Sequence, residues 1–263
     1  MTVETDLPAA VRRERIVAIV EQHGFAKVAE LSDRFGTSEV TTRADLDALA
    51  ESRSVQRIHG GAIANSASEL PFEATTLEAA AAKRAIGLAA ASIVESGQAI
   101  ILDVGTTTTA IARALLDRAD LKNVVVITNA LNIALALEHA IPRFEVIVTG
   151  GTLRPLQHSL VDPLAGAVLQ HIHADLAFIG CSGVDPKAGI TNVNLPEADI
   201  KRRMIAAAGR TIVVADGSKL GVAQHSRVAA LSDIDTIITS SDAEPASVAQ
   251  LTAVGPRVVI ADA

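Results

Sequence analysis

The stretch TSEVTTRADLDALAESRSVQRIHGGA, from Thr37 to Ala62, predicts one helix followed by a short hairpin. Ser38 is a suitable N-cap, because its hydroxyl can accept a hydrogen bond from an early backbone N–H of the helix. The spacing i, i+4, i+7 then places three residues on one helix face: Thr42, Leu46 and Leu49. Other side chains of this helix are expected to point elsewhere: Thr41, Arg43 and Asp45.

The second half of the stretch alternates as a strand does, with Val55, Arg57 and His59 leading to Gly60-Gly61, where a tight reversal is easy. A capped helix that offers Ser, Thr and Arg near its start, followed by a basic hairpin, is typical of a winged helix-turn-helix that enters a DNA groove. The pattern therefore predicts a DNA-contacting surface made of these residues: Ser38, Thr41, Thr42, Arg43, Arg53, Arg57, His59 and Gly60.

Two further helices are expected before this stretch. Residues 8–23 carry an apolar stripe, which consists of Ile16, Ile19 and Val20. Val28, Leu31 and Phe35 repeat at i, i+3 and i+7, and Gly36 suits the left-handed stop of that second helix. Together with the hairpin, these helices predict a winged-helix domain at residues 8–63.

The composition is that of a core-forming globular chain, since 49% of its 263 residues are hydrophobic and 20% are charged. The start of the chain lacks the basic-then-apolar layout of a signal peptide, and no apolar run reaches about 18 residues, so we expect no membrane span. The single cysteine, Cys181, excludes an internal disulfide and fits the cytoplasm. A net charge of -7 predicts weak non-specific attraction to nucleic acid, although clustered arginines can still supply phosphate contacts.

The rest of the chain divides into a linker and a larger domain. Residues 64–78 are small and polar, include Pro71 and show no sustained period, so they predict a linker. Residues 79–263 begin with an alanine-rich helix, Ala79–Val94, and then alternate β-rich runs with helical segments. The β-rich runs are Ala99–Val104, Asn123–Thr128, Phe144–Thr149, Asp175–Gly180, Thr211–Asp216, Thr236–Thr239 and Val258–Ala261. The helical segments between them include Ala110–Ala119, Leu131–His139 and Glu197–Ala208. This alternation predicts an α/β domain with a mainly parallel sheet, whose ligands bind at the carboxyl ends of the strands.

The loop DVGTTTT, from Asp103 to Thr109, joins the first of these runs to a helix. Gly105 permits close backbone approach, and the free N–H groups at a helix start favour an anion such as phosphate. One threonine by itself is usually an N-cap, but four in succession behind Asp103 favour phosphate binding. Loops after other strands converge on the same rim: Thr128-Asn129, Thr149-Gly150-Gly151 and Asp216-Gly217-Ser218-Lys219. Lys219 could pair with a phosphate, although a lone lysine is usually a solvated surface charge.

Three further features of the sequence could indicate catalytic or metal sites. Glu197 and Lys201 are spaced i, i+4 on a predicted helix, and this spacing favours a surface ion pair over catalysis. Cys181 follows a strand but has no His beside it in a nucleophile pattern, so we interpret it as structural. The His residues are scattered, and neither C-x-x-C nor H-E-x-x-H occurs, so no metal site and no cofactor are expected.

The sequence resembles the DeoR family of bacterial transcriptional repressors over nearly its whole length. The amino-terminal motif is seen in Val28-Ala29-Glu30-Leu31, Ser38, Thr41, Arg43, Asp45-Leu46, Leu49, Arg57 and His59-Gly60-Gly61-Ala62. The carboxy-terminal motif is seen in Leu102-Asp103, Gly105-Thr106-Thr107, Thr128-Asn129, Gly150-Gly151, Gly180, Gly183-Val184-Asp185, Glu197, Lys201, Asp216, Ser218-Lys219 and Leu231-Ser232-Asp233-Ile234-Asp235. The chain departs from the family pattern at Thr42, Ala44 and Arg53, where members usually have an apolar residue, a basic residue and Gly.

The resemblance implies a winged helix followed by a sugar-isomerase-like α/β domain at residues 79–263. That domain would bind a phosphorylated sugar or polyol and release the protein from double-stranded operator DNA near sugar-metabolism genes. The candidate effector-binding residues are Asp103, Gly105, Thr106, Thr107, Thr108, Asn129, Gly150, Gly151, Glu197, Lys201, Asp216 and Lys219. A homodimer or homotetramer is expected, because repressors gain affinity from symmetric pairs on repeated half-sites.

Two other functions would each account for part of the sequence. A sugar-phosphate isomerase or transferase would use Asp103, Glu197 or Lys201 for proton transfer, but it would leave the stretch from Thr37 to Ala62 without a role. A helical oligomerisation or adaptor module would keep the three helices but would gain nothing from the basic hairpin. We therefore expect a DNA-binding regulator and no enzyme.

Overall fold

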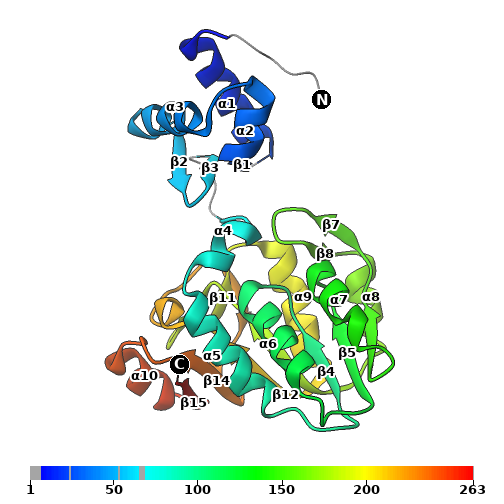
Figure 1. The fold of residues 1–263 in the computed structure, drawn as a ribbon. Coiled ribbons are helices and arrows are strands. Elements are labelled where there is room, and N and C mark those ends of the chain that lie inside the picture. Colours follow the sequence, from blue (N-terminus) through cyan, green and yellow to red (C-terminus); the bar gives the residue numbers. More distant parts are fainter. Residues whose placement is uncertain (1–6, 24, 53, 65–68, 263) are drawn as a thin grey trace. The chain divides into compact units, whose positions relative to one another are not determined.

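The computed structural model describes residues 7–23, 25–52, 54–64 and 69–262. The chain forms two compact units, Met1–Thr75 and Thr76–Ala263 (Figure 1). The fold class is the one expected from the sequence, since a winged helix-turn-helix is followed by an α/β unit with a mainly parallel sheet.

The first unit packs three helices against a small antiparallel sheet. Its elements are α1 (Ala9–His23), β1 (Phe25–Lys27), α2 (Val28–Phe35), α3 (Glu39–Glu51), β2 (Val55–Ile58) and β3 (Gly61–Ala64). The strands pair in the order β1-β3-β2, and the core contains Ile16, Leu31, Phe35 and Leu46. Gly36 ends α2 in the left-handed conformation, with φ 61° and ψ 32°, as its place in the sequence predicts. Sequence patterns missed β1, because three residues are too few to show a period and they become a strand only by pairing with β3.

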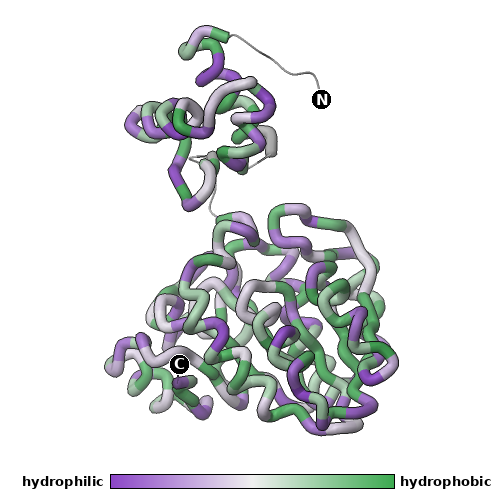
Figure 2. Tube along the Cα trace, viewed as in Figure 1, coloured by the Kyte–Doolittle hydropathy of each residue, from purple (hydrophilic) through white to green (hydrophobic). Residues whose placement is uncertain are grey.

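The second unit is built on a seven-stranded parallel sheet in the order β15-β14-β12-β9-β4-β5-β6. These strands are β4 (Ala99–Leu102), β5 (Val124–Thr128), β6 (Phe144–Val148), β9 (Ala174–Gly180), β12 (Ala208–Val214), β14 (Thr236–Ser240) and β15 (Arg257–Ala261). Each of them overlaps one of the β-rich runs that the sequence predicts, although β12 begins three residues earlier than expected and ends two residues earlier. The runs are recognisable because strands buried on both faces consist almost entirely of apolar residues. In Figure 2 the central segments of this unit are accordingly mostly green, the colour of hydrophobic residues.

Helices cover both faces of this sheet, so the unit has two apolar cores. The first face carries α5 (Ala80–Ala91), α6 (Thr106–Asp117) and α7 (Leu131–Leu137). The second carries α8 (Leu164–Leu169), α9 (Leu195–Ala206) and a small antiparallel sheet of β10 (Gly183–Asp185), β11 (Gly189–Asn192) and β13 (Ser226–Ala229). The pleat of β4 divides its side chains accordingly, since Ile100 and Leu102 enter the first core and Ile101 enters the second.

The remaining elements are short. They are a two-stranded hairpin, β7 (Thr152–Arg154) and β8 (Ser159–Val161), a last helix α10 (Pro245–Thr252) and 3₁₀ turns at Glu138–Ala140, Gly217–Lys219 and Leu231–Asp233. Residues 64–78, which the sequence predicts as a linker, include one short helix, α4 (Phe72–Leu77). Pro71 starts this helix, since its carbonyl accepts hydrogen bonds from the backbone N–H groups of Ala74 and Thr75. Within the described residues, no helix has the length and apolarity needed to cross a membrane.

The order of the strands fixes where a ligand would bind. The chain runs from β4 outward to β5 and β6, then returns to the other side of β4 and continues through β9, β12, β14 and β15. The direction of winding therefore reverses between β4 and β9. In open parallel sheets the ligand crevice forms at this switch point, outside the carboxyl ends of the two strands. Asp103 directly follows β4, and Gly180 is the last residue of β9.

Candidate functional site

The exposed side of α3 carries most of the predicted DNA-contacting residues of that helix. Ser38 caps the helix, since its Oγ accepts a hydrogen bond from the backbone N–H of Thr41 over 3.1 Å. Arg43 is exposed and forms an i, i+4 ion pair with Glu39 at 2.5 Å. Val40 is 73% exposed beside them, and sequence reasoning did not select it. An exposed apolar side chain among polar ones at a helix start is suited to a thymine methyl in the major groove.

One of the predicted residues, Thr42, is not on this surface. Thr42 is buried, and its hydroxyl lies 3.0 Å from the hydroxyl of Thr37, so it supports the start of the helix and is not accessible to DNA. This burial follows from the same i, i+4, i+7 face that holds Leu46 and Leu49 in the core. Arg53 lies outside the residues that the structure describes.

The wing is held to α3 by Arg57. Its Nε lies 2.8 Å from Oδ1 of Asp47, and its guanidinium donates to the carbonyl of Gly61 over 2.7 Å. Through these contacts Arg57 stabilises the position of the wing on α3, and it also places a positive charge on the wing. His59 and Gly60 form the exposed tip of the hairpin, where Gly60 has φ +77° in open space.

The expectation that Asp45 points away from the core is wrong. Its carboxylate is buried and pairs with two consecutive arginines of α1, with Arg12 Nε at 2.5 Å and Arg13 Nε at 2.8 Å. The helix wheel missed this, because α1 packs on the flank of α3 that the wheel leaves to solvent. The two ion pairs hold α3 in place against α1, and they thereby set the direction in which the exposed side of α3 faces.

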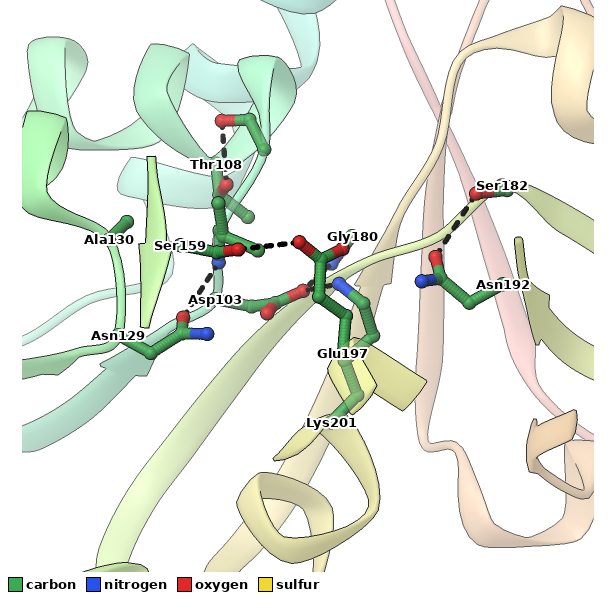
Figure 3. Close-up of polar contacts among 12 residues, drawn as sticks. Asp103, Thr108, Asn129, Ala130, Ser159, Gly180, Ser182, Asn192, Glu197 and Lys201 are labelled. Atoms are coloured by element: carbon green, nitrogen blue, oxygen red, sulfur yellow. Dashed lines mark hydrogen bonds and ion pairs between the residues drawn. The ribbon is translucent and has the colours of Figure 1, made fainter. Parts of the chain in front are cut away.

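In the second unit, Asp103 occupies the switch point of the sheet (Figure 3). It has no exposed surface, and its Oδ2 accepts a hydrogen bond from the backbone N–H of Gly180 over 3.0 Å and an ion pair from Lys201. Its Oδ1 is buried without a hydrogen-bond partner among the described residues. Buried polar atoms are nearly always satisfied, so this oxygen is a free acceptor suited to a donor from a ligand or water.

The helix that follows Asp103 begins without a side-chain cap. Gly105 is the N-cap of α6 with φ 146°, and having no side chain it leaves the first N–H groups of the helix without a capping partner. The hydroxyls of Thr108 and Thr109 donate back to the Gly105 carbonyl, over 2.9 Å and 2.7 Å. Those two hydroxyls are therefore used inside the loop, and the groups left to meet a ligand are the backbone N–H groups around Thr106 and Thr107, which are of the kind that suits an anion.

The predicted surface ion pair between Glu197 and Lys201 is wrong. Both side chains are buried: Lys201 pairs with Asp103, while Oε1 of Glu197 accepts from Arg154 and, over 2.6 Å, from Ser159 Oγ (Figure 3). The four charges of Asp103, Lys201, Glu197 and Arg154 form one network of alternating sign. Sequence spacing cannot show this, because the partners are 98 residues apart for Lys201 and 43 residues apart for Glu197.

Burial and neighbouring charges shift the pKa values in this network. Burial raises the pKa of Asp103 above its ordinary value, and the charge of Lys201 offsets only part of this effect. Desolvation lowers the pKa of Lys201, but the charges of Asp103 and Glu197 outweigh it and hold that pKa above its ordinary value. Lys201 is therefore a cation whose charge is balanced inside the protein.

The other predicted effector residues have different surroundings. Asn129 is buried, with its Oδ1 accepting from the Val104 N–H at 3.1 Å and its Nδ2 donating to the Leu160 carbonyl at 3.2 Å, so it positions the loop. Gly150 and Gly151 have φ +70° and +122° and lead into β7. Asp216 accepts hydrogen bonds from Ser218, and the charges of Asp216 and Lys219 act on Lys83 and Cys181, so these groups share the rim.

Three residues of this region were missed by sequence reasoning: Lys83, Arg154 and Ser159. Burial lowers the pKa of Lys83, which donates to the Glu78 carbonyl over 2.7 Å. The available signal for Arg154 was its place three residues after Gly151, in a loop that follows a strand. Desolvation raises the pKa of Cys181 to about 12, which agrees with a structural thiol. Among the described residues, no group of three or more acidic, His or Cys side chains could hold a metal ion.

Comparisons with known proteins define the class of the chain. The DeoR-like helix-turn-helix domain matches residues 12–68, and the DeoR C terminal sensor domain matches residues 78–241. The chain belongs to the DeoR family of transcriptional regulators, as the sequence motifs predict. Each unit of the structure corresponds to one of the two family domains.

Named relatives align over nearly the whole chain. A Bacillus subtilis protein named uncharacterized HTH-type transcriptional regulator YulB is 37% identical, over 92% of this chain and 93% of its own. A putative aga operon transcriptional repressor of Escherichia coli is 34% identical, over 95% and 93%. The glycerol-3-phosphate regulon repressor of Escherichia coli is 30% identical, over 91% and 94%. A solved ribose 5-phosphate isomerase of Methanocaldococcus jannaschii has 17% identity and a TM-score of 0.41 over 54% of this chain and 55% of its own, a likeness too slight to bear on function.

Proposed function

We propose that the protein represses carbohydrate-metabolism genes in the cytoplasm and leaves its operator when it binds a phosphorylated sugar or polyol. The observation that carries the effector half is the buried, unpartnered Oδ1 of Asp103 beside the uncapped start of α6. The helix start suits a phosphate, and the free carboxylate oxygen suits a hydroxyl of the same molecule. Relatives named as repressors of an aga operon and of a glycerol-3-phosphate regulon support the same ligand class.

The DNA half of the proposal rests on the exposed face of α3 and the tip of the wing. Arg43, Thr41 and His59 are exposed there, and the ion pair that Arg43 would give up on meeting a phosphate or a guanine edge is itself exposed. Operators are usually read by symmetric pairs of such helices. The protein would therefore act as a homodimer or homotetramer, which light scattering at micromolar concentration checks.

An enzymatic role is not favoured by the second unit. A general base needs a group that is free to accept the substrate's proton. Glu197 accepts from Arg154 and Ser159, and Lys201 is a charged donor. Asp103 keeps one free oxygen, but its carboxylate is already paired with the Lys201 cation. These groups suit recognition of a ligand better than proton transfer.

Two variants test the proposal in opposite directions. Arg43→Ala should weaken operator binding by about 1–3 kcal/mol and leave effector binding unchanged. Thr107→Glu places a carboxylate where the phosphate would lie, so it should keep operator binding but lose release by the effector. A thermal-shift screen of phosphorylated sugars and polyols first supplies the effector, since ligand at 100 times its dissociation constant stabilises by about 2.7 kcal/mol.

Matched controls isolate the two effects. Arg202→Ala removes an arginine from a similar exposed ion pair, with Asp199, and Thr252→Glu adds a carboxylate on the exposed side of α10. In gel-shift titrations at fixed salt, with and without effector, both control variants should show the operator affinity and the effector release of the wild type. Equal effector release from wild type and Thr107→Glu would exclude this loop as the phosphate site, and unchanged operator affinity in Arg43→Ala would remove Arg43 from the interface.

A further inference from the structure

Arg154 pairs, at the edge of the effector region, with a carboxylate that also serves another donor. It lies at the end of β7, and its guanidinium pairs with Oε1 of Glu197 on α9. The same Oε1 accepts from Ser159 Oγ over 2.6 Å. The Arg154 side chain is 19% exposed, whereas that of Glu197 is 5% exposed. Arg154 is therefore reachable from solvent, while its partner is not.

The ion pair lies close to the start of α6. Asn129 accepts from the N–H of Val104, in the loop before α6, and donates to the carbonyl of Leu160, on β8. Ser159, the neighbour of Leu160, donates to Glu197. These bonds connect the anion-binding loop to Glu197, and through it to Arg154, in a few steps. Figure 3 shows the hydrogen bonds made by Asn129 and by Ser159. Lys219 is a poorer candidate for a phosphate at this loop, because it follows β12, and β9 separates β12 from β4.

The charges of this network already balance before any ligand arrives. Asp103 and Glu197 supply two negative charges, and Lys201 and Arg154 supply two positive charges. A phosphate entering the site brings additional negative charge, so a cation has to exchange its partner. Lys201 is the less available cation, because its side chain is 3% exposed and both carboxylates act on it. Arg154 is the more exposed, and its planar guanidinium suits two oxygens of one phosphate.

We propose that Arg154 binds the effector's phosphate, and that it does so by leaving Glu197. The proposal rests on the proposed function, since it names the cation and the switch of that same site. When Arg154 leaves, the freed Glu197 carboxylate can accept a hydroxyl of the sugar or polyol. The exchange also removes the ion pair that fastens the β7–β8 hairpin to α9, so binding changes how this hairpin is held.

Opposite effects of two variants distinguish this exchange from a purely structural ion pair. If Glu197 competes with phosphate for Arg154, then Arg154→Gln weakens the binding of inorganic phosphate and Glu197→Gln strengthens it. A pair that only supports the fold predicts that both variants weaken binding. The double variant decides whether any gain acts through Arg154, because the gain of Glu197→Gln should vanish when Arg154 is also replaced.

The experiment measures dissociation constants of inorganic phosphate and of glycerol 3-phosphate for the full-length protein, by calorimetry or a thermal-shift titration. We expect Arg154→Gln to weaken both by on the order of tenfold or more. Arg154→Lys should bind with intermediate affinity, because it keeps the charge but loses the fork, and it serves as the test if Arg154→Gln does not fold. Arg202→Gln, which breaks an exposed arginine pair of α9, should bind as the wild type does.

Failure of this inference and failure of the proposed function give different results. Wild-type phosphate affinity in Arg154→Gln, or weaker binding of inorganic phosphate in both single variants, would overturn the exchange and leave the effector site in place. A wild-type protein that binds neither inorganic phosphate nor any phosphorylated sugar or polyol would overturn the proposed function and this inference together.

Discussion

Replacing Asp45 with Ala should unfold the first unit at a much lower temperature. Asp45 joins α3 to α1 through two arginines, and its side chain is 3% exposed. The Arg13 side chain is 39% exposed, so its ion pair with Asp45 should contribute only about 0.2–1 kcal/mol to stability. The Arg12 side chain is 11% exposed, and removing Asp45 takes away the carboxylate that balances this largely buried cation.

Most of the expected loss of unfolding free energy comes from the Arg12–Asp45 ion pair. Breaking a buried pair from one side costs about 3–5 kcal/mol. The lower end applies here, because Arg12 also donates to the Leu7 carbonyl over 3.0 Å and keeps that bond in the variant. A loss of about 3 kcal/mol in a domain of this size corresponds to a fall in melting temperature of more than about 12 °C.

Calorimetry of the variant and its controls measures this directly. Arg12→Ala should lose much more stability than Arg13→Ala, and a double-mutant cycle should show strong coupling of Asp45 to Arg12 and weak coupling to Arg13. Asp47→Ala is the matched control, because Asp47 lies on the same helix in an exposed pair with Arg57. If Asp45→Ala lowers the melting temperature no more than Asp47→Ala does, the buried pair does not hold α3 against α1.

Two further predictions concern the second unit. Lys201→Met leaves Asp103 without its opposite charge in surroundings that raise the pKa of that carboxyl. When the pKa of an acid is higher in the folded than in the unfolded protein, the protein loses stability as the pH rises from the unfolded pKa, about 3.9, through the folded pKa. The loss of unfolding free energy of this variant relative to the wild type, measured in urea, should therefore be larger at about pH 8 than at about pH 5. An equal loss at both pH values would contradict the assignment. Because the pKa of Cys181 is raised to about 12, the native thiol should react with iodoacetamide far more slowly than the same thiol in denaturant, as mass spectrometry would show. Equal alkylation rates in the two states would mean that Cys181 is an ordinary accessible thiol.

The amino-acid sequence by itself determined the elements that depend on neighbours along the chain. Ser38 and Gly36 act as local caps whatever packs around them, and the apolar runs of the central sheet identify its strands before any pairing is known. The Gly105 loop is likewise readable, because the chain must turn from a strand into a helix there. For the same reason the winged helix and the α/β unit were both predictable.

Tertiary structure alone decided which side chains meet at the site. Strand order set the switch point between β4 and β9, and no local pattern gives the order in which strands pair. The i, i+4 spacing correctly makes Glu197 and Lys201 neighbours on one helix, but the face that carries them is buried against the sheet and the β7–β8 hairpin. In those surroundings each charge has to be neutralised by the nearest opposite charge in space, since water is not available to solvate it. Arg154 and Asp103 met that requirement, and both are far from their partners along the chain.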